Sequence, residues 1–271
     1  MKFVGHTMGT PELDVCRAID LYSSIGMDAI EIVAQEGGKF WIDAPDELIE
    51  QVMEAARKLP DGVVTLTPYY WHINNSDEQV RRENIEGMKR AIQLAKRMGA
   101  KFVRAYGGTD NAGGTMEENW IRAVDALKEI APAAEACGIT VVVENHPGTM
   151  TRTGEATARL IAEVGSPSVR ALYDAANVLY DTSEPWEHTF DAQKDIIAYV
   201  HVKDFFMEGE NRKACAVGQG IVPWDKIVKK LEEIGYDGYC SFEYEKRWYP
   251  DQLEDAEIGV PACIRYIQRV M

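Results

Sequence analysis

The stretch TVVVENHP, residues 140–147, decides the fold of this chain. Thr140 to Val143 all favour β-structure, and a short apolar run of this kind indicates a strand buried on both faces. The run ends on Glu144, and His146 follows two residues later. Because side chains two residues apart point to the same side of a strand, this carboxylate and this imidazole face one way. The sequence therefore predicts chemically active side chains at the carboxyl end of a buried strand.

The same arrangement returns in three later stretches. ALYDAAN contains Asp174, YVHVKDF contains His201, and YCSFEYE contains Glu243. Counted from Glu144, the intervals are 30 residues (144 to 174), 27 (174 to 201) and 42 (201 to 243), each about one strand and one helix long. Such spacing indicates repeated strand-helix units with a polar residue where each of these strands ends.

Strand-like and helix-like segments alternate along the whole chain. The expected strands are 2–8, 28–34, 63–70, 101–108, 140–147, 169–174, 198–203 and 238–243. The expected helices are 12–25, 45–59, 77–98, 116–136, 154–164, 187–196, 223–234 and 252–270. Strict alternation implies parallel strands with right-handed crossovers, and eight units in 271 residues are typical of a (β/α)8 TIM barrel. An open, doubly wound sheet would usually carry GxGxxG after its first strand, which GHTMGT does not match. We therefore expect residues 1–271 to form one TIM barrel domain.

Composition narrows the class of partner. With 44 Asp and Glu against 29 Lys and Arg, the net charge of −15 disfavours nucleic acid and anionic lipid. No apolar run approaches the ~20 residues of a membrane helix, and the N-terminus lacks a signal-peptide core. The five cysteines are scattered and form no CxxC, as in reduced cytosolic proteins. We expect a cytoplasmic protein with a small-molecule substrate and no nucleic-acid or membrane partner; the sequence leaves a homo-oligomer open.

The four recurring polar residues form a candidate metal site. In a TIM barrel the carboxyl ends of the strands meet at one mouth, with neighbouring strands about 4.8 Å apart. Two glutamates, one aspartate and one histidine form a donor set rich in carboxylate oxygens. Such a set suits Mn²⁺, Mg²⁺ or Co²⁺ better than it suits a structural zinc site, which is typically built from thiolates. We expect Glu144, Asp174, His201 and Glu243 to bind one divalent metal, Mn²⁺ in preference to Mg²⁺, Co²⁺ or Zn²⁺.

Further polar side chains share the expected strand parity and would face the same mouth. They are His6, Arg104, His146, Lys203 and Glu245. We expect them to bind substrate. Arg104 and Glu31 lie inside apolar strands, where an unpaired charge is costly, so they are also candidates for a mutual ion pair or for contacts with the metal shell. Lys203 could alternatively pair with its neighbour Asp204.

Three weaker signals remain open. His72 follows the third strand, and His188 opens a helix and is expected on the surface. Aromatic residues after the strands could form an apolar wall for a sugar or could serve simple packing: Tyr69, Tyr70, Trp71, Trp224 and Trp248. The loops after the last two strands, the usual phosphate site of such barrels, offer Gly218, Gly220, Lys246 and Arg247, which are equally consistent with a solvated surface.

Several motifs together resemble the sugar phosphate isomerase/epimerase group of xylose isomerase-like TIM barrels. They are VVVENH, LYDAANV, YVHVKDF, GQGIVPW and SFEYE. The resemblance spans nearly the whole chain but is poorly specific for substrate. It implies that the four residues above bind one metal and that Glu144 and Glu243 act as acid and base. Asn177 stands where several epimerases and the related endonucleases have histidine; we keep it among the expected substrate contacts. Those endonucleases hold three metals with many histidines, whereas this chain has five in all.

The expected function is a metal-dependent ketose or keto-sugar isomerase or epimerase. A divalent ion chelated by a carbonyl and its neighbouring hydroxyl favours proton removal from carbon, and two carboxylates can remove and return that proton through an enediolate. The same enediolate can expel a β-substituent, so a dehydratase or lyase is the alternative. Its substrate would be a keto-sugar, a keto-inositol or a 3-keto-glycoside, including a C-glycoside. A non-catalytic sugar- or metal-binding protein is the third reading.

Overall fold

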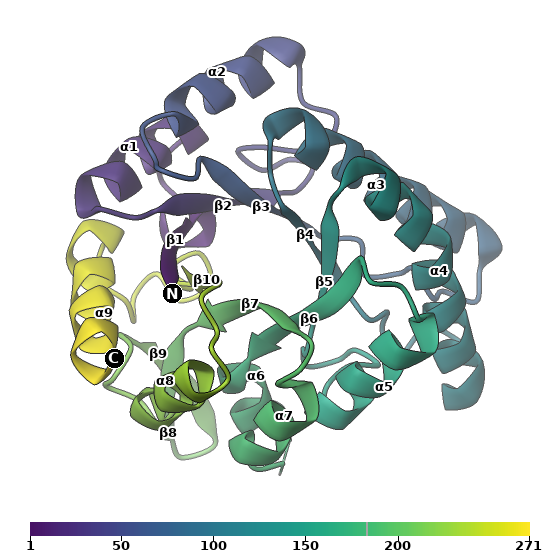
Figure 1. The fold of residues 1–271 in the computed structure, drawn as a ribbon. Coiled ribbons are helices and arrows are strands. Elements are labelled where there is room, and N and C mark those ends of the chain that lie inside the picture. Colours follow the sequence, from purple (N-terminus) through teal and green to yellow (C-terminus); the bar gives the residue numbers. More distant parts are fainter. Residues whose placement is uncertain (183) are drawn as a thin grey trace.

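The computed structural model describes residues 1–182 and 184–271. The barrel strands are β1 (Lys2–His6), β2 (Ala29–Ala34), β3 (Val63–Pro68), β4 (Phe102–Tyr106), β5 (Thr140–Glu144), β6 (Val169–Asp174), β7 (Ile197–Val202) and β10 (Tyr239–Phe242). They are parallel and close in the order β1-β10-β7-β6-β5-β4-β3-β2. Figure 1 shows the helices arranged around this barrel. The expected single-domain TIM barrel is confirmed.

The helices surround the barrel, and local chemistry explains several of their ends. Their bounds are α1 (Val15–Ile25), α2 (Asp46–Ala56), α3 (Glu78–Met98), α4 (Met116–Cys137), α5 (Gly154–Val164), α6 (Ala175–Asp181), α7 (Trp186–Gln193), α8 (Trp224–Glu233) and α9 (Ala256–Val270). Thr115 and Glu118 form a reciprocal capping box at the start of α4. Gly99 and Gly138 end α3 and α4 with positive φ angles of 73° and 66°, which glycine adopts without strain. These two helix ends lie where the sequence placed them.

Alternation within the strands determines which side chains enter the barrel. Val142, Leu172, Tyr199 and Tyr239 belong to a small inner cluster, whereas Val141 and Val143 pack in the large outer core beneath the helices. Glu144, Asp174 and His201 each follow an inner-cluster residue by two positions, and Glu243 follows Tyr239 by four. Strand parity therefore carries all four polar side chains into the barrel at its carboxyl end.

Three segments differ from the expected pattern. The connection after β7 contains an antiparallel hairpin of β8 (Asp204–Glu208) and β9 (Asn211–Cys215), which the sequence did not predict. The short helix α6 directly after β6 was also missed. Strand β1 ends at His6 rather than residue 8, and a single 3-10 turn, η1 (Thr7–Gly9), follows. Among the described residues, no helix combines the length and apolar character that a membrane crossing requires.

Candidate metal centre

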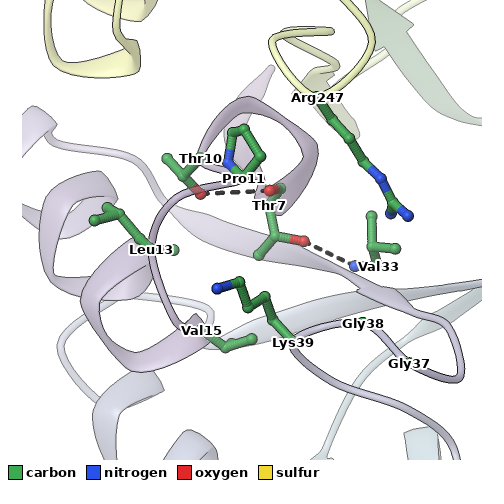
Figure 2. Close-up of a pocket in the computed structure, with 11 residues that line it drawn as sticks. Thr7, Thr10, Pro11, Leu13, Val15, Val33, Gly37, Gly38, Lys39 and Arg247 are labelled. Atoms are coloured by element: carbon green, nitrogen blue, oxygen red, sulfur yellow. Dashed lines mark hydrogen bonds between the residues drawn. The ribbon is translucent and has the colours of Figure 1, made fainter. Parts of the chain in front are cut away.

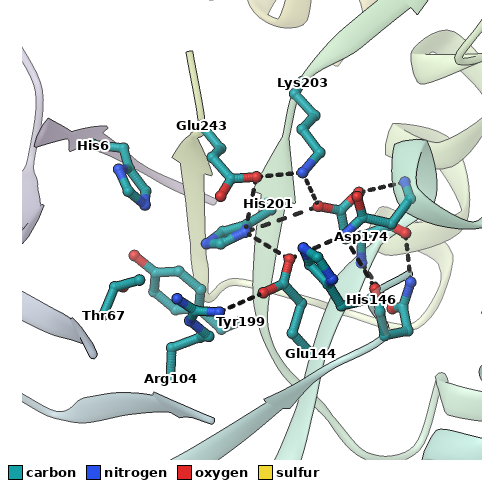
Figure 3. A network of polar contacts seen from close by, with 12 residues as sticks. His6, Thr67, Arg104, Glu144, His146, Asp174, Tyr199, His201, Lys203 and Glu243 are labelled. Atoms are coloured by element: carbon teal, nitrogen blue, oxygen red, sulfur yellow. Dashed lines mark hydrogen bonds and ion pairs between the residues drawn. The ribbon is translucent and has the colours of Figure 1, made fainter. Parts of the chain in front are cut away.

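The four predicted ligands come together at the carboxyl end of the barrel. One possible ligand atom from each of Glu144, Asp174, His201 and Glu243 lies within 4.8 Å of the others. The ring nitrogen His201 Nδ1 is central to the group: it lies 3.6 Å from Glu144 Oε1, 3.9 Å from Asp174 Oδ2 and 3.4 Å from Glu243 Oε2. All four side chains are at least 92% buried. Figure 3 shows them converging from neighbouring strands.

This geometry fits a divalent cation. His201 Nδ1 is buried and has no hydrogen-bond partner among the described residues, although three carboxylates surround it. Buried polar atoms are normally paired, and clustered buried carboxylates repel one another without a positive charge between them. An ion bound to the imidazole nitrogen and the carboxylate oxygens would meet both needs, and the donor set suits Mn²⁺, Mg²⁺, Co²⁺ or Zn²⁺.

Glu31 orients the histidine of this group. His201 Nε2 lies 3.2 Å and 3.3 Å from the two oxygens of Glu31, and Tyr199 donates to Glu31 Oε2 at 3.0 Å. His6 Nε2 lies 3.3 Å from Glu31 Oε1. Burial alone would raise the pKa of the Glu31 carboxyl, but His6 and His201 lower it well below its ordinary value. A carboxylate at Nε2 favours the tautomer that leaves Nδ1 free to bind a metal.

Lys203 supplies positive charge on the other side of the group. Its Nζ lies 2.8 Å from Asp174 Oδ2, contacts Glu243 Oε2, and lies 3.9 Å from Glu245 Oε1. Burial would lower the pKa of this ammonium, but Asp174 and Glu243 hold it well above its ordinary value. The alternative pairing with Asp204 is wrong, because the Asp204 carboxylate accepts instead from backbone N–H groups of the following loop.

Comparisons with known proteins agree with this architecture. Residues 19–265 match the family described as xylose isomerase-like TIM barrel. The chain belongs to this family. A fructoselysine 3-epimerase from Escherichia coli O157:H7 is 26% identical over 252 residues, which cover 90% of each chain. An inosose dehydratase from Geobacillus thermodenitrificans is 25% identical over 191 residues, covering 60% of this chain and 64% of the relative.

Solved structures show the same fold. A D-tagatose 3-epimerase-like protein aligns with a TM-score of 0.82 and 22% identity, covering 100% of this chain and 98% of the other. The IolI protein, whose structure contains a bound zinc atom, aligns with a TM-score of 0.79 and 22% identity, covering 100% and 96%. At these identities the likeness establishes the barrel alone.

In the structure, Arg104 contacts Glu144 and not Glu31. Its Nη1 lies 3.3 Å from Glu144 Oε2, and its guanidinium carbon lies 3.8 Å from the ring centroid of Tyr106 and 4.9 Å from that of Tyr69. The suggested mutual pair of Arg104 and Glu31 is therefore wrong, although both residues do contact the metal group. Burial would raise the pKa of Glu144, but His146 and His201 lower it to about 2, and it is ionised at neutral pH.

An aromatic wall stands beside Glu144. Trp71 stacks on Tyr106 with ring centroids 3.5 Å apart, and both rings meet the edge of His146 at 5.1 Å. Burial lowers the pKa of His146 below its ordinary value, although the neighbouring Glu144 carboxylate acts in the opposite direction. The other proposed wall residues serve differently: Trp224 is buried and donates to the backbone oxygen of Lys203. The wall consequently comes from the loop after β3 and the end of β4.

Asn177 holds two of the four candidate metal ligands, Glu144 and Asp174, in place. Its side-chain nitrogen donates to Glu144 Oε1 at 3.0 Å, and its backbone N–H donates to Asp174 Oδ1 at 2.9 Å. Asn145, which we did not single out from the sequence, exchanges two hydrogen bonds with the Asp174 backbone at 2.6 Å and 3.0 Å. Asn177 thus fixes the carboxylate of Glu144, and Asn145 fixes the backbone of Asp174. Asn145 could have been noticed from its place between Glu144 and His146.

The β8–β9 hairpin adds a cation that sequence reasoning missed. Arg212 Nη2 donates to Glu245 Oε2 at 2.5 Å, and the guanidinium lies 5.0 Å from the ring centroid of Phe205. Glu245 links it to Lys203. Lys203, Glu245 and Arg212 therefore form a buried line of alternating charge from the metal group to the hairpin.

Other candidates lie away from the centre. His188 is 56% exposed and faces Glu155, as expected of a surface residue, and His72 is exposed. The backbone N–H groups of Gly218 and Gly220 both donate to Asp204, and Lys246 Nζ donates to a backbone oxygen and pairs with Asp255. The backbone N–H groups of Gly218 and Gly220 and the amine of Lys246 thus all have partners within the protein, which argues against phosphate binding at these three of the four suggested residues.

Proposed function

We propose that this chain is a divalent-metal-dependent epimerase or isomerase of a ketose or keto-sugar. The observation that carries the proposal is the position of Glu144 and Glu243 on either side of His201, with two strands of the barrel, β6 and β7, between theirs. Two carboxylates placed in this way can remove a proton from one face of a carbon and return it to the other. The relative that acts as a fructoselysine 3-epimerase supports this reaction class.

The metal would be held by Glu144, Asp174, His201 and Glu243, and Mn²⁺ is the ion we favour. When bound, it would polarise the substrate carbonyl and the adjacent hydroxyl and so acidify the hydrogen on carbon. The zinc atom bound in the IolI protein supports the proposal that this barrel binds a divalent ion. The choice of Mn²⁺ for this chain is part of the proposal.

The surrounding side chains would bind and orient the sugar. Lys203 and Arg104 reach the two glutamates and can donate hydrogen bonds to substrate oxygens that gain negative charge. His146, packed against Trp71, can contact a hydroxyl while the aromatic rings exclude water. The remaining predicted contacts, His6, Asn177 and Glu245, touch Glu31, Glu144 and Lys203 respectively, so we assign them the positioning of these groups.

A dehydratase or lyase is the second candidate. The inosose dehydratase relatives favour it. Glu245, which pairs with Lys203 and Arg212, is a further buried carboxyl group beside the site. The first step would be the same proton removal by a glutamate, but the acid would then protonate a departing β-substituent instead of carbon.

Turnover of ketoses in D₂O tests the proposal. Mn²⁺-loaded protein is incubated with a panel of free and phosphorylated ketoses and keto-inositols, and products are identified by NMR. An epimerase or isomerase should place deuterium on the carbon next to the carbonyl, or show an isotope effect for that hydrogen if one glutamate returns the same proton. A lyase should lose that hydrogen together with the β-substituent. Turnover with neither exchange nor an isotope effect would refute proton abstraction as the slow step.

A further inference from the structure

A pocket of about 450 Å³ lies at the rim of the barrel, apart from the metal centre. It is formed by the loops that follow β1, β2 and β10, together with the first turn of α1 (Figure 2). Its lining contains two cations, Lys39 and Arg247, and two threonines, Thr7 and Thr10. Among the described residues, none that lines it is acidic, although the chain has 44 acids against 29 lysines and arginines. The local charge is thus opposite to that of the whole protein.

Arg247 is held in place by all three loops. Its backbone N–H donates to the carbonyl of Met8 at 3.1 Å, and its Nη2 donates to Gln35 Oε1 at 2.7 Å. No carboxylate of the described residues forms an ion pair with it within 4.0 Å. The guanidinium therefore has no carboxylate neighbour among the described residues to neutralise it, and it has further N–H donors for a ligand.

Lys39 is presented by a closed turn. Gln35 N–H donates to Phe40 O, and Gly38 N–H donates to Gln35 O, both at 2.9 Å. Phe40, the next residue in the chain, is fully buried and anchors this turn. Figure 2 shows the Lys39 amine and the Arg247 guanidinium directed into the pocket from different sides. The described residues offer Lys39 no carboxylate partner either.

The rest of the lining offers one hydroxyl donor and an apolar wall. Thr7 Oγ1 accepts from the backbone N–H of Val33 at 2.8 Å, so its own hydrogen can be donated to a ligand. The apolar part of the lining consists of Pro11, Leu13, Val15, Ala18 and Val33. A lining with two cations that lack a carboxylate partner and with five apolar residues matches an anion that carries carbon, since charge-assisted hydrogen bonds hold the charged head and apolar contact holds the stem.

We propose that this pocket binds a small organic anion, a carboxylate or phosphate on a short apolar stem. The anion could be the far end of the sugar substrate, since Thr7 directly follows His6 of the metal centre, or a separate metabolite. Binding itself does not depend on the reaction proposed for the metal centre, so failure of one proposal leaves the other standing.

Calorimetric titration of the full chain with hexanoate, hexanamide and inorganic phosphate tests the pocket. We expect hexanoate to bind at one site per chain and at least tenfold more tightly than hexanamide. Lys39→Gln and Arg247→Gln should each weaken hexanoate about tenfold, the loss of one charged hydrogen bond. Lys128→Gln, an exposed lysine on α4, should change nothing. Leu13→Gln should weaken hexanoate but not phosphate.

Equal affinity for hexanoate and hexanamide, or unchanged hexanoate binding by both Lys39→Gln and Arg247→Gln, would overturn the proposal. The source of the anion is then separated with the Mn²⁺-loaded enzyme, an arm that rests on the proposed function. If the pocket holds the substrate's end, Lys39→Gln lowers kcat/KM about tenfold for ketoses with a terminal phosphate or carboxylate, and not for neutral ketoses. If it holds a separate metabolite, both kinds of ketose are unaffected while hexanoate binding is still lost. Either result supports the site.

Discussion

The barrel has a polar cluster at each end, and the two are built differently. At the amino ends of the strands, Asp61 Oδ2 accepts from Lys2 Nζ at 2.5 Å and from Tyr239 OH at 3.0 Å, and Lys101 donates to the same tyrosine oxygen. Cations and anion there are partnered and partly exposed. At the carboxyl ends, three carboxylates surround His201 Nδ1, which is buried and without a hydrogen-bond partner among the described residues.

The difference separates a cluster that stabilises the fold from one arranged for chemistry. We call the cluster at the amino ends of the strands the lower cluster and the one at the carboxyl ends the upper cluster. Charges that are partly exposed and fully partnered each contribute little to the stability of the fold, so the lower cluster tolerates the loss of a member. At the carboxyl ends, by contrast, three carboxylates are buried around an imidazole nitrogen that has no hydrogen-bond partner among the described residues, and buried groups with perturbed pKa values concentrate at functional sites. The upper cluster is therefore expected to respond to a metal and the lower one is not.

The largest effect should come from the two glutamates. Glu144→Gln and Glu243→Gln should each reduce kcat by more than the ~10²–10⁴ of a lone acid-base defect, because metal affinity falls as well. Asp61→Asn at the other end, and His188→Ala on the surface, should leave kcat within about twofold. Steady-state kinetics on the deuterium-incorporating ketose measures this. If Asp61→Asn is as damaging as either glutamine variant, the two ends do not differ in function.

The second largest effect should come from removal of the metal, which should affect turnover and stability through the upper cluster and not through the lower cluster. Dialysis against a chelator should abolish turnover, and Mn²⁺ should restore it. Added at 100 times its dissociation constant, Mn²⁺ should stabilise the folded chain by about 2.7 kcal/mol. Calorimetric unfolding should show this gain in Asp61→Asn and lose it in Glu243→Gln. A chelated protein that keeps full activity, or an equal gain in both variants, would show that the upper cluster is not a metal site.

A smaller effect on metal affinity is expected from Glu31 and Tyr199, which support the candidate ligand His201. Glu31→Gln should weaken Mn²⁺ binding about 10–100-fold, because the amide no longer supports the His201 tautomer that leaves Nδ1 free. Tyr199→Phe, which removes only one hydrogen bond to Glu31, should weaken it by less than about tenfold. Competition with a fluorescent chelator measures both. Unchanged affinity in Glu31→Gln would mean that the carboxylate does not orient the histidine.

Much of the upper cluster could be predicted from sequence because its cause is local. Side chains alternate strictly along a strand, so Glu144, Asp174 and His201 had to share a side, and the alternation of strands and helices brought those sides to one mouth. Their meeting required no knowledge of side-chain packing. Whether they bind metal stays a prediction.

Partner choice and the hairpin could not be predicted, because they depend on neighbours in space. Glu31 stands directly opposite His6 in the register of β1 and β2, whereas Arg104 lies two strands away on β4, so the expected pair never meets. The β8–β9 hairpin lies between the expected strand 198–203 and the expected helix 223–234, where no strand or helix was predicted. A structureless loop of such length is uncommon in a compact domain, and that was the available signal for the strand that carries Arg212.

The smallest effect concerns the lower cluster and its dependence on pH. The hydrogen bond from Lys2 lowers the pKa of Asp61 below its ordinary value of 3.8, and Tyr239 adds to this. A carboxyl whose pKa is depressed in the folded state stabilises the protein above its unfolded pKa, and this stabilisation is lost as pH falls through the folded value. Asp61→Asn should therefore lower the free energy of unfolding by less than about 1 kcal/mol at pH 7, since the carboxylate is partly exposed. Urea titrations of both proteins should show that the difference shrinks as the pH falls below 3.8. A difference that grows on acidification would mean that the Asp61 carboxylate opposes folding at neutral pH, and the two ends of the barrel would then be alike in holding unfavourable charge.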